Sequence, residues 1–334
     1  MTSSALAETA QALVADGKGI LAADESSPTI KKRFDSIKIE STEENRRDYR
    51  DMLFTTPDAG KYISGVILYD ETIRQKAADG TPLVDKLTKA GMIPGIKVDM
   101  GAKPLAGHPE ETVTEGLDGL RGRLEEYAKL GARFTKWRGV YRIGDAIPSA
   151  GCITANAHAL ARYAALAQEA GLVPIVEPEV LMDGDHDIDV CEAVTEEVLR
   201  SVYNELALQD VWLEGTLLKP NMVISGQDCK DQAGVQEVAE RSVQCLKRTV
   251  PAAVPGIVFL SGGQSDALAT EHLNAMNRLP GTLPWKLSFS YGRALQAAPL
   301  KAWSGKAANL EKGQAAFLKR AQDNAAAASG KYAA

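Results

Sequence analysis

The chain has 334 residues, of which 45% are hydrophobic and 25% charged, as is typical of a globular protein with a large core. Its net charge of −6 gives it no general attraction to nucleic acids or anionic membranes. Because no apolar run approaches the ~18 residues of a membrane span and the N-terminal segment lacks the basic start of a signal peptide, we expect a cytoplasmic protein whose partners are neither nucleic acid nor membrane.

Eight short segments rich in apolar and β-branched residues recur along the chain and predict eight strands. Their starts lie between 31 residues (256 to 287) and 44 residues (19 to 63) apart, which leaves room for one helix and two loops between neighbours. The segments are 19–24 (GILAAD), 63–69 (ISGVILY), 95–100 (GIKVDM), 133–138 (RFTKWR), 173–179 (VPIVEPE), 213–219 (LEGTLLK), 256–261 (GIVFLS) and 287–291 (LSFSY).

The stretches between these segments have the patterns of helices. Residues 41–44 (STEE) form a capping-box signature before a helix that contains Tyr49 and Met52. Residues 156–170 carry apolar side chains at helical spacing and end before Gly171. Residues 236–247 predict another amphipathic helix, which stops before Pro251.

Eight strand–helix units predict an α/β protein with a single (β/α)₈ barrel domain over residues 1–334; a doubly wound open sheet is the structural alternative. No linker, tandem repeat or low-complexity segment divides the chain. The Ala-rich end, residues 325–334, is predicted to be a fraying helix end followed by a disordered tail.

Charged residues stand at nearly every predicted strand end, where a barrel builds its active site. They are Asp24, Lys97, Lys136, Arg138, Glu177, Glu179, Lys219 and Arg293. A single lysine or arginine is readily explained as a solvated head on a surface stem. Five cations at one rim of an acidic protein instead indicate an anionic substrate.

Lys219 follows an uncharged run, residues 215–218 (GTLL), at the end of the sixth predicted strand. Apolar surroundings disfavour the ammonium form and expose the neutral amine, which is the nucleophilic form of lysine. A neighbouring Lys136 would add like-charge repulsion. A strand-end lysine that simply reaches water is the other interpretation of this position.

Two glycine-containing loops, residues 261–264 (SGGQ) and 290–293 (SYGR), follow the seventh and eighth predicted strands. Barrels commonly hold phosphate in these two loops, because glycine lets backbone N–H groups approach the phosphate oxygens. Arg293 can add a fork of donors. A tight turn is the alternative for either loop alone, but two adjacent loops of this kind favour a phosphate site.

Other motifs argue against a cofactor or a metal. No G-x-G-x-x-G follows a predicted strand, so a dinucleotide site is not indicated. Residues 183–187 (DGDHD) resemble the start of a calcium loop but lack its glycine and its final glutamate. The four histidines have no zinc-ligand spacing, and the four cysteines form no C-x-x-C pair, which predicts reduced thiols.

Taken together, these motifs resemble those of the class I fructose-bisphosphate aldolases, from about residue 17 to residue 331. The motifs that carry the resemblance are GKGILAADES, STEENRRDYR, GIKVD, VPIVEPE, LEGTLLKPNMV, FLSGGQS and FSYGRALQA. The resemblance implies a metal-free, usually tetrameric (β/α)₈ barrel. Its reaction converts fructose 1,6-bisphosphate reversibly into dihydroxyacetone phosphate and glyceraldehyde 3-phosphate.

The resemblance also implies roles for individual residues. Lys219 would form the Schiff base, and Glu177 would be the general acid that expels water from the carbinolamine. Asp24, Lys136 and Glu179 resemble the rest of the acid–base cluster. The ketone-side phosphate would lie on Ser261, Gly262, Gly263, Ser290, Gly292 and Arg293, and the other phosphate near Ser26, Thr29, Arg33, Lys97 and Arg138.

Two departures and two alternatives accompany this resemblance. Pro28 and Thr29 stand where many relatives have glycine and serine, and the chain ends without the longer tail and terminal tyrosine of eukaryotic relatives. A Schiff-base barrel of the transaldolase type is one alternative, although its substrate would not need a phosphate cradle at the last two loops. A non-catalytic barrel scaffold is the other.

Overall fold

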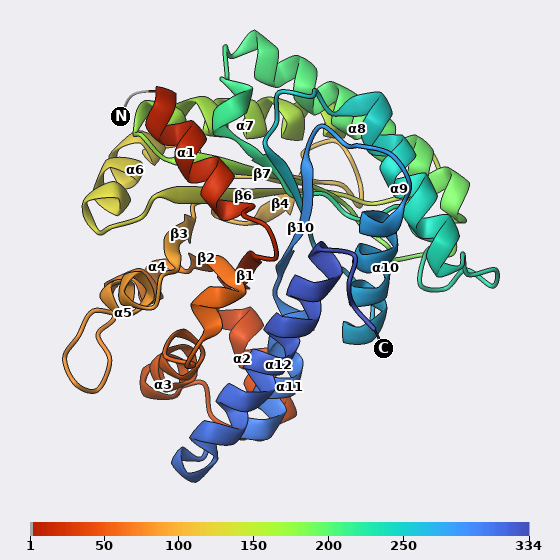
Figure 1. The fold of residues 1–334 in the computed structure, drawn as a ribbon. Helices are drawn as coiled ribbons and strands as arrows, with labels where there is room; N and C mark the ends of the chain where they lie inside the picture. The colour runs from red at the N-terminus through yellow and green to blue at the C-terminus, as the bar shows by residue number, and fades with distance from the viewer. Residues whose placement is uncertain (1–2, 334) are drawn as a thin grey trace.

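Eight parallel strands close into a barrel in a computed structural model that describes residues 3–333. Around the barrel the strands follow the order β1-β10-β9-β8-β7-β6-β3-β2, so the predicted (β/α)₈ barrel is confirmed (Figure 1). The barrel strands are β1 (Gly19–Ala23), β2 (Ile63–Leu68), β3 (Ile93–Lys97), β6 (Phe134–Tyr141), β7 (Val173–Val180), β8 (Leu217–Leu218), β9 (Gly256–Phe259) and β10 (Lys286–Tyr291).

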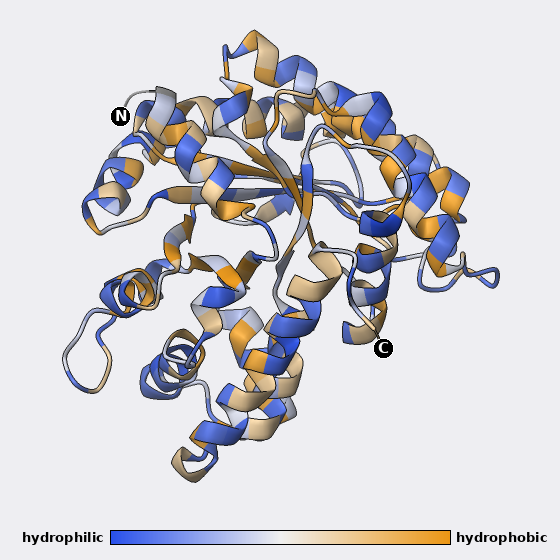
Figure 2. Cartoon of the chain, viewed as in Figure 1, coloured by the Kyte–Doolittle hydropathy of each residue, from blue (hydrophilic) through white to orange (hydrophobic). Residues whose placement is uncertain are grey.

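Helices surround the barrel, and buried apolar residues of most of them belong to one core cluster with outward-facing strand residues. They are α1 (Ser3–Leu13), α2 (Ser27–Ser36), α3 (Glu43–Phe54), α4 (Asp70–Arg74), α5 (Leu83–Lys89), α6 (Leu120–Lys129), α7 (Ala150–Glu169), α8 (Ile188–Leu208), α9 (Val235–Thr249), α10 (Asp266–Arg278), α11 (Arg293–Trp303) and α12 (Leu310–Ala328), with 3₁₀ turns at Ala59–Lys61, Leu213–Gly215 and Ala307–Asn309. Hydrophobic colours gather on the central strands in Figure 2, whereas the helices carry both colours. None of the helices in the described part of the chain has the length and apolar character to cross a membrane.

Two apolar layers follow from the period-2 alternation of the strands. Outward-facing residues such as Leu21 and Trp137 pack against the helices. Inward-facing residues such as Ile20 and Phe134 form a separate interior core together with one face of α1. Helix α1 therefore closes the N-terminal end of the barrel, because Leu13 joins this interior core.

Glycine makes room for this interior core. A β-carbon on Gly95 would lie only 2.3 Å from the ring of Phe134, and one on Gly65 would lie 2.6 Å from Leu13. The closed end of the barrel is thus filled by side chains that need small residues on the facing strands.

Several predicted boundaries differ from the observed ones. The predicted capping box starts one residue early, because Thr42 rather than Ser41 is the N-cap and accepts the backbone N–H of Asn45. Helix α7 begins six residues before position 156, since Ser149 caps it and accepts the N–H of Cys152. The hairpin of β4 (Ala102–Pro104) and β5 (Thr112–Thr114) was not predicted, as its strands are short and largely polar.

The sixth predicted strand is much shorter than its sequence pattern suggests. Residues Leu213–Gly215 form a 3₁₀ turn in which the Leu213 carbonyl accepts both the N–H and the hydroxyl of Thr216. Only Leu217 and Leu218 pair as β8. The prediction was wrong here because the side chain of Gln168, on α7, holds the backbone of this turn. Its Nε2 donates to the carbonyls of Trp212 and Gly215, and its Oε1 accepts the N–H of Trp212.

The C-terminal end also differs from the disordered tail predicted from residue 325. Helix α12 continues through Ala328, because Ala325 and Ala327 are buried against the neighbouring helices. Beyond the helix, the N–H of Tyr332 donates to Asn274 Oδ1 on α10 at 3.0 Å. Residue 334 lies outside the described residues.

The four cysteines have the unpaired state that their spacing predicts. Cys152, Cys191 and Cys245 are buried as free thiols, and Cys229 is half-buried. Burial raises the pKa of the Cys245 thiol and keeps it protonated.

Candidate active site

On β6 and β7, the side chains that face the barrel interior change from apolar to charged toward the C-terminal ends of the strands. Phe134 on β6 and Ile175 on β7 both face the interior core. Counting in steps of two from these residues, the next interior positions are Lys136 and Arg138 on β6 and Glu177 and Glu179 on β7. The same strands thus contribute apolar side chains to the closed end and charged ones to the open end.

Four charged groups form a continuous chain of ion pairs across the open end of the barrel; the Asp24 side chain is 12% exposed, and the other three are at most 5% exposed. Lys136 Nζ lies 2.7 Å from Asp24 Oδ2 and 3.0 Å from Glu177 Oε2. The other oxygen of Glu177, Oε1, lies 2.9 Å from Lys219 Nζ. The order is therefore Asp24, Lys136, Glu177, Lys219, with alternating sign, and it joins residues from β1, β6, β7 and the end of β8.

Lys219 reaches this chain because of its position directly after β8. Its backbone N–H donates to Val176 O at 2.8 Å, which extends the pairing of β8 with β7 by one residue. Leu217 faces the interior core, so Lys219, two residues later, faces the interior as well. Only 5% of its side chain is exposed, which removes the interpretation of a surface lysine that reaches water.

Asp24 and Glu177, the two carboxylates in this series of ion pairs, stay ionised. Burial alone would raise the pKa of Asp24, but Lys136 and Lys219 outweigh this effect and hold it at about 2. Burial would likewise raise the pKa of Glu177, and the same two lysines lower it. In the free site both groups are therefore carboxylates at neutral pH.

Lys136 and Lys219 differ in the number of carboxylates that they contact. Burial disfavours the ammonium form of Lys136, but Asp24 and Glu177 on either side raise its pKa. Lys219 is the last member of this series of ion pairs. It contacts a single carboxylate, that of Glu177, which also contacts Lys136. Lys219 therefore has fewer carboxylate partners than Lys136, and its amine lies next to a carboxylate oxygen of Glu177.

Glu179, predicted as part of the acid–base cluster, forms its ion pair outside this chain. Among the described residues its carboxylate pairs with Arg138 and not with Lys136 or Lys219. Burial opposes the charge of Arg138, but Glu179 outweighs it and raises the pKa of the guanidinium. A β-carbon on Gly262 would lie 3.4 Å from Glu179 Oε1, so this carboxylate lies between β6 and the loop after β9.

The loop after β9 needs both of its glycines. A β-carbon on Gly262 would lie 2.4 Å from Met182 Cε, and one on Gly263 would lie 2.4 Å from Gln227 Nε2. Gly263 also has φ +68°, which a side chain disfavours. Ser261 precedes them and is buried. The loop therefore presents backbone where a side chain would otherwise stand.

The loop after β10 offers unsatisfied donors. The Ser290 side chain is buried, and its hydroxyl has no hydrogen-bond partner within residues 3–333. Gly292 is the N-cap of α11 and leaves the first N–H groups of that helix without a side-chain cap. Arg293 opens the helix and donates from Nη2 to Gln264 O at 2.6 Å. This arrangement suits an anion.

The loop after β1 lies beside the loop after β10. Ser26 is the N-cap of α2 without a side-chain cap bond, and its hydroxyl lies 3.1 Å from that of Thr29. Arg33 pairs with the buried Glu25. A β-carbon on Gly292 would lie 3.4 Å from Arg33 Nη2, so Arg33 lies next to the predicted ketone-side phosphate loop rather than only at the other phosphate.

Two buried acidic residues at this rim were not predicted as part of the site. Asp99 Oδ1 lies 2.6 Å from Lys97 Nζ, and Glu25 accepts from Arg33 and, at 2.7 Å, from Gln296 Nε2. Asp99 stands two residues after Lys97, and Glu25 directly follows Asp24. That spacing was the available signal, but a sequence does not show which cation a carboxylate pairs with.

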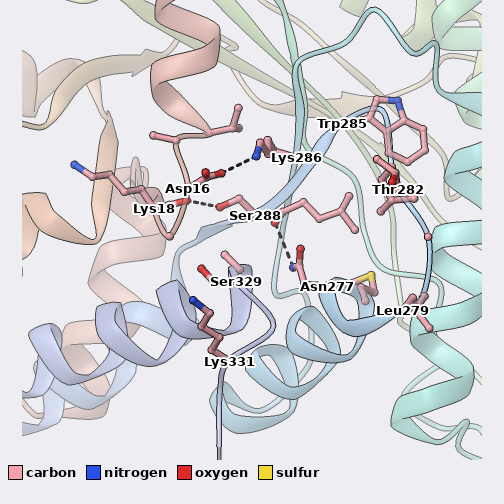
Figure 3. Close-up of a pocket in the computed structure, with 18 residues that line it drawn as sticks. Asp16, Lys18, Asn277, Leu279, Thr282, Trp285, Lys286, Ser288, Ser329 and Lys331 are labelled. Atoms are coloured by element: carbon pink, nitrogen blue, oxygen red, sulfur yellow. Dashed lines mark hydrogen bonds and ion pairs between the residues drawn. The ribbon is translucent and has the colours of Figure 1, made fainter.

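A cavity of about 360 Å³ adjoins this rim and is lined by Arg33, Arg293 and Gln296, by Ser36 and Ile37 at the end of α2, and by Ala297, Leu300 and Lys301 of α11. A larger hollow of about 490 Å³ lies at the opposite, N-terminal end of the barrel (Figure 3). There Lys286 Nζ pairs with Asp16 at 2.7 Å, and Ser288 Oγ donates to the Lys18 carbonyl. None of the described residues that line this second hollow is a predicted site residue.

The histidines and acidic residues do not assemble a metal-binding group. Within residues 3–333, no cluster of three or more His, Cys, Asp or Glu side chains is arranged to hold a metal ion. The open end places a buried amine beside a carboxylate, next to a loop whose buried Ser290 hydroxyl has no partner among the described residues.

Comparison with known proteins gives one consistent result. The model of the class-I fructose-bisphosphate aldolase family matches residues 5–334. A probable fructose-bisphosphate aldolase class 1 of Xanthomonas campestris pv. campestris is 64% identical over 328 residues, which is 98% of each chain. Cytosolic fructose-bisphosphate aldolase 4 of Arabidopsis thaliana is 57% identical over 95% of this chain and 80% of its own length.

A solved structure gives the same result. Fructose-bisphosphate aldolase of Plasmodium falciparum, crystallised in complex with TRAP and a small-molecule inhibitor, superposes with a TM-score of 0.98. It is 53% identical, and the match covers 99% of this chain and 96% of that chain.

Proposed function

The chain belongs to the class-I fructose-bisphosphate aldolase family, and we propose that Lys219 is the amine that forms a covalent imine with its ketone substrate. The reaction is the reversible aldol cleavage of fructose 1,6-bisphosphate to dihydroxyacetone phosphate and glyceraldehyde 3-phosphate, which makes the protein a lyase of glycolysis. The transaldolase-type and scaffold alternatives are set aside by the family match. The contact of Lys219 Nζ with Glu177 Oε1 at 2.9 Å carries the residue assignment.

Imine formation begins with a proton transfer along that contact. Lys219 gives a proton to the Glu177 carboxylate, and its neutral amine attacks the ketone carbon, so that a C–N bond forms and the carbonyl π pair moves to oxygen. A proton moves from nitrogen to that oxygen to give the neutral carbinolamine. Lys136 stays an ammonium ion, because two carboxylates hold its charge.

Glu177 then acts as the acid. It is ionised in the free site, but it now carries the proton that it took from Lys219. The proton that it took from Lys219 goes to the carbinolamine hydroxyl, and water leaves as the C–N bond becomes an iminium. Glu177 is again a carboxylate and can remove the hydroxyl proton of the departing aldehyde half. The C–C bond electrons move into the iminium and produce an enamine. Asp24, held at a pKa of about 2, serves to keep Lys136 charged and in place.

We assign the two phosphates of the substrate to opposite sides of the open end of the barrel. We assign the ketone-side phosphate to the loops after β9 and β10, with the unpartnered Ser290 hydroxyl, the N-terminus of α11 and Arg293 as donors. Arg33 Nη2 would lie 3.4 Å from a β-carbon on Gly292, and this proximity supports a role for Arg33 in binding the ketone-side phosphate as well. Lys97, Ser26, Thr29 and Arg138 are assigned to the other phosphate.

The protein's environment and assembly are proposed from its relatives. Two Arabidopsis thaliana relatives, 57% and 58% identical, are named cytosolic, which supports a cytoplasmic location. The family resemblance supports a homotetramer, and light scattering behind a sizing column measures it directly.

A coupled cleavage assay with fructose 1,6-bisphosphate tests the proposal. Wild-type protein should cleave the sugar at the same rate before and after prolonged treatment with a chelator, because the covalent route needs no Lewis acid. Lys219→Met should lose cleavage while keeping its fold, measured by thermal unfolding. Retained cleavage in Lys219→Met, or activity that chelation removes and zinc restores, would refute the lysine route.

A further inference from the structure

The buried acid Asp99 has no part in the chemistry described above, yet it contacts two strands of the open end. It follows β3, and 2% of its side chain is exposed. Its Oδ1 accepts from Lys97 Nζ at 2.6 Å and from the Gly101 N–H at 3.0 Å. Its Oδ2 accepts from the backbone N–H of Arg138 on β6 at 3.3 Å. Both oxygens are therefore engaged with groups that adjoin the proposed distal phosphate.

The contacts of Lys97 leave its ammonium group one free donor. An ammonium carries three N–H donors. One goes to Asp99 Oδ1, and a second goes to the Asp99 backbone carbonyl at 3.0 Å. The remaining donor is fixed in direction by the other two, so Lys97 can present it to a phosphate oxygen without first ordering a flexible side chain.

The same carboxylate also fixes β6 relative to β3. Arg138 is held by its N–H on Asp99 and by its carbonyl, which accepts from Thr114 Oγ1 at 2.7 Å. Lys97 pairs in register with Lys136, two residues before Arg138. Asp99 thus links the cation of the proposed distal phosphate to the strand that carries the catalytic lysine cluster.

We propose that Asp99 is a positioning residue that orients Lys97 toward the second phosphate of the substrate and thereby sets the preference for bisphosphorylated over monophosphorylated ketoses. This inference rests on the proposed role of Lys97. A simple turn at Gly101, which has φ +90°, would account for the Gly101 contact alone. It would explain neither the pair with Lys97 nor the bond to the neighbouring strand.

The choice of substrate separates a positioning role from a structural one. Fructose 1,6-bisphosphate carries the distal phosphate, and fructose 1-phosphate lacks it. A loss of Lys97 orientation lowers kcat/KM for the bisphosphate and spares the monophosphate. Damage to the barrel lowers both in parallel.

The test compares the ratio of kcat/KM values, bisphosphate over monophosphate, in a set of variants. Asp99→Asn should lower this ratio about tenfold, the usual effect of losing a hydrogen bond to a charged group. Glu192→Gln is the matched control, since Glu192 is also a buried, ion-paired carboxylate but lies on α8, and it should leave the ratio unchanged. An unchanged or increased ratio in Asp99→Asn overturns the inference.

Lys97→Met separates failure of this inference from failure of the proposed role of Lys97. If Lys97→Met leaves the ratio unchanged, the assignment of Lys97 to the distal phosphate is wrong. If Lys97→Met lowers the ratio and Asp99→Asn does not, Asp99 has no positioning role. The double variant removes the ion pair of Asp99 and Lys97 as a neutral unit, so it leaves neither charge without its partner. Its ratio should equal that of Lys97→Met, and a further tenfold fall would contradict action through Lys97.

Discussion

The two ends of the barrel are built on the same strands but treat charge in opposite ways. At the C-terminal end, Lys136 and Glu177 are each 4% exposed and belong to a chain of alternating charges. At the N-terminal end, helix α1 fills the interior with apolar side chains, and the ion pair of Asp16 with Lys286 is 86% and 60% exposed. The exposed ion pair at the closed end contributes little to stability, because water solvates both charges. The charges at the open end are desolvated, so removing one partner leaves the other unpaired at a high cost in free energy.

The difference shows how the alternation of inward- and outward-facing side chains along one strand can supply both core residues and charged site residues. The interior face of β7 begins with Val173 and Ile175 and continues with Glu177 and Glu179. The apolar pair contributes to the core that α1 covers, and the acidic pair faces the open mouth. The well-packed N-terminal half of the barrel holds the strand ends in place, and the strand ends carry the groups that we propose to react.

Removing the shared carboxylate should have the largest effect at the open end. Glu177→Gln leaves Lys219 without its proton acceptor and the carbinolamine without its acid. We expect kcat to fall about 10²- to 10⁴-fold, the usual contribution of a positioned acid–base group. Single-turnover measurement of imine formation checks this. A normal rate of imine formation in Glu177→Gln would show that another group carries the proton.

The next effect in size concerns Arg293, which we place on the ketone-side phosphate. Arg293 is exposed in the free protein, so Arg293→Ala should cost about 1.5–3 kcal/mol of productive binding, the range for losing a hydrogen bond to a charged group. The loss should appear with fructose 1,6-bisphosphate and with fructose 1-phosphate, because both carry that phosphate. Arg142→Ala, at an exposed ion pair with Glu110, is the control. A loss with the bisphosphate alone would place Arg293 at the distal phosphate.

A smaller effect is expected in the pH dependence of folding. The pKa of Asp24 is about 2 in the folded protein and 3.8 for the unperturbed group. The unfolded chain therefore binds more protons in this range, so Asp24 contributes stability above pH ~4 that is lost as pH falls through ~2. The contribution is about 2 kcal/mol. Urea unfolding between pH 5 and 3 should show a weaker pH dependence for Asp24→Asn than for wild type, and equal slopes would contradict this.

The smallest effect is expected at the closed end. Lys286→Met removes an exposed ion pair with Asp16, and solvent already screens that pair. Its free energy of unfolding should change by less than about 0.5 kcal/mol, and kcat should stay the same. A loss of activity in this variant would mean that the two ends of the barrel are not as independent as their packing indicates.

Sequence periodicity predicted eight strand–helix units and favoured a barrel over a doubly wound sheet, and the structure confirms the barrel. Of the charged strand-end residues that the sequence indicated, Asp24, Lys136, Glu177 and Lys219 meet at the open end. Partner choice could not be predicted, because it depends on contacts between distant strands. Glu179 pairs with Arg138 instead of joining the lysines, Arg33 lies beside Gly292, and Asp99 binds Lys97. The 3₁₀ turn before β8 was likewise set by tertiary contacts.

The central claim is that Lys219, and not the better-paired Lys136, is the lysine that reacts. Borohydride reduction in the presence of dihydroxyacetone phosphate converts the imine into a stable secondary amine. Peptide mass spectrometry should then find the added mass on the peptide that contains Lys219, together with loss of activity. A label on Lys136, or on any other lysine, would contradict the account.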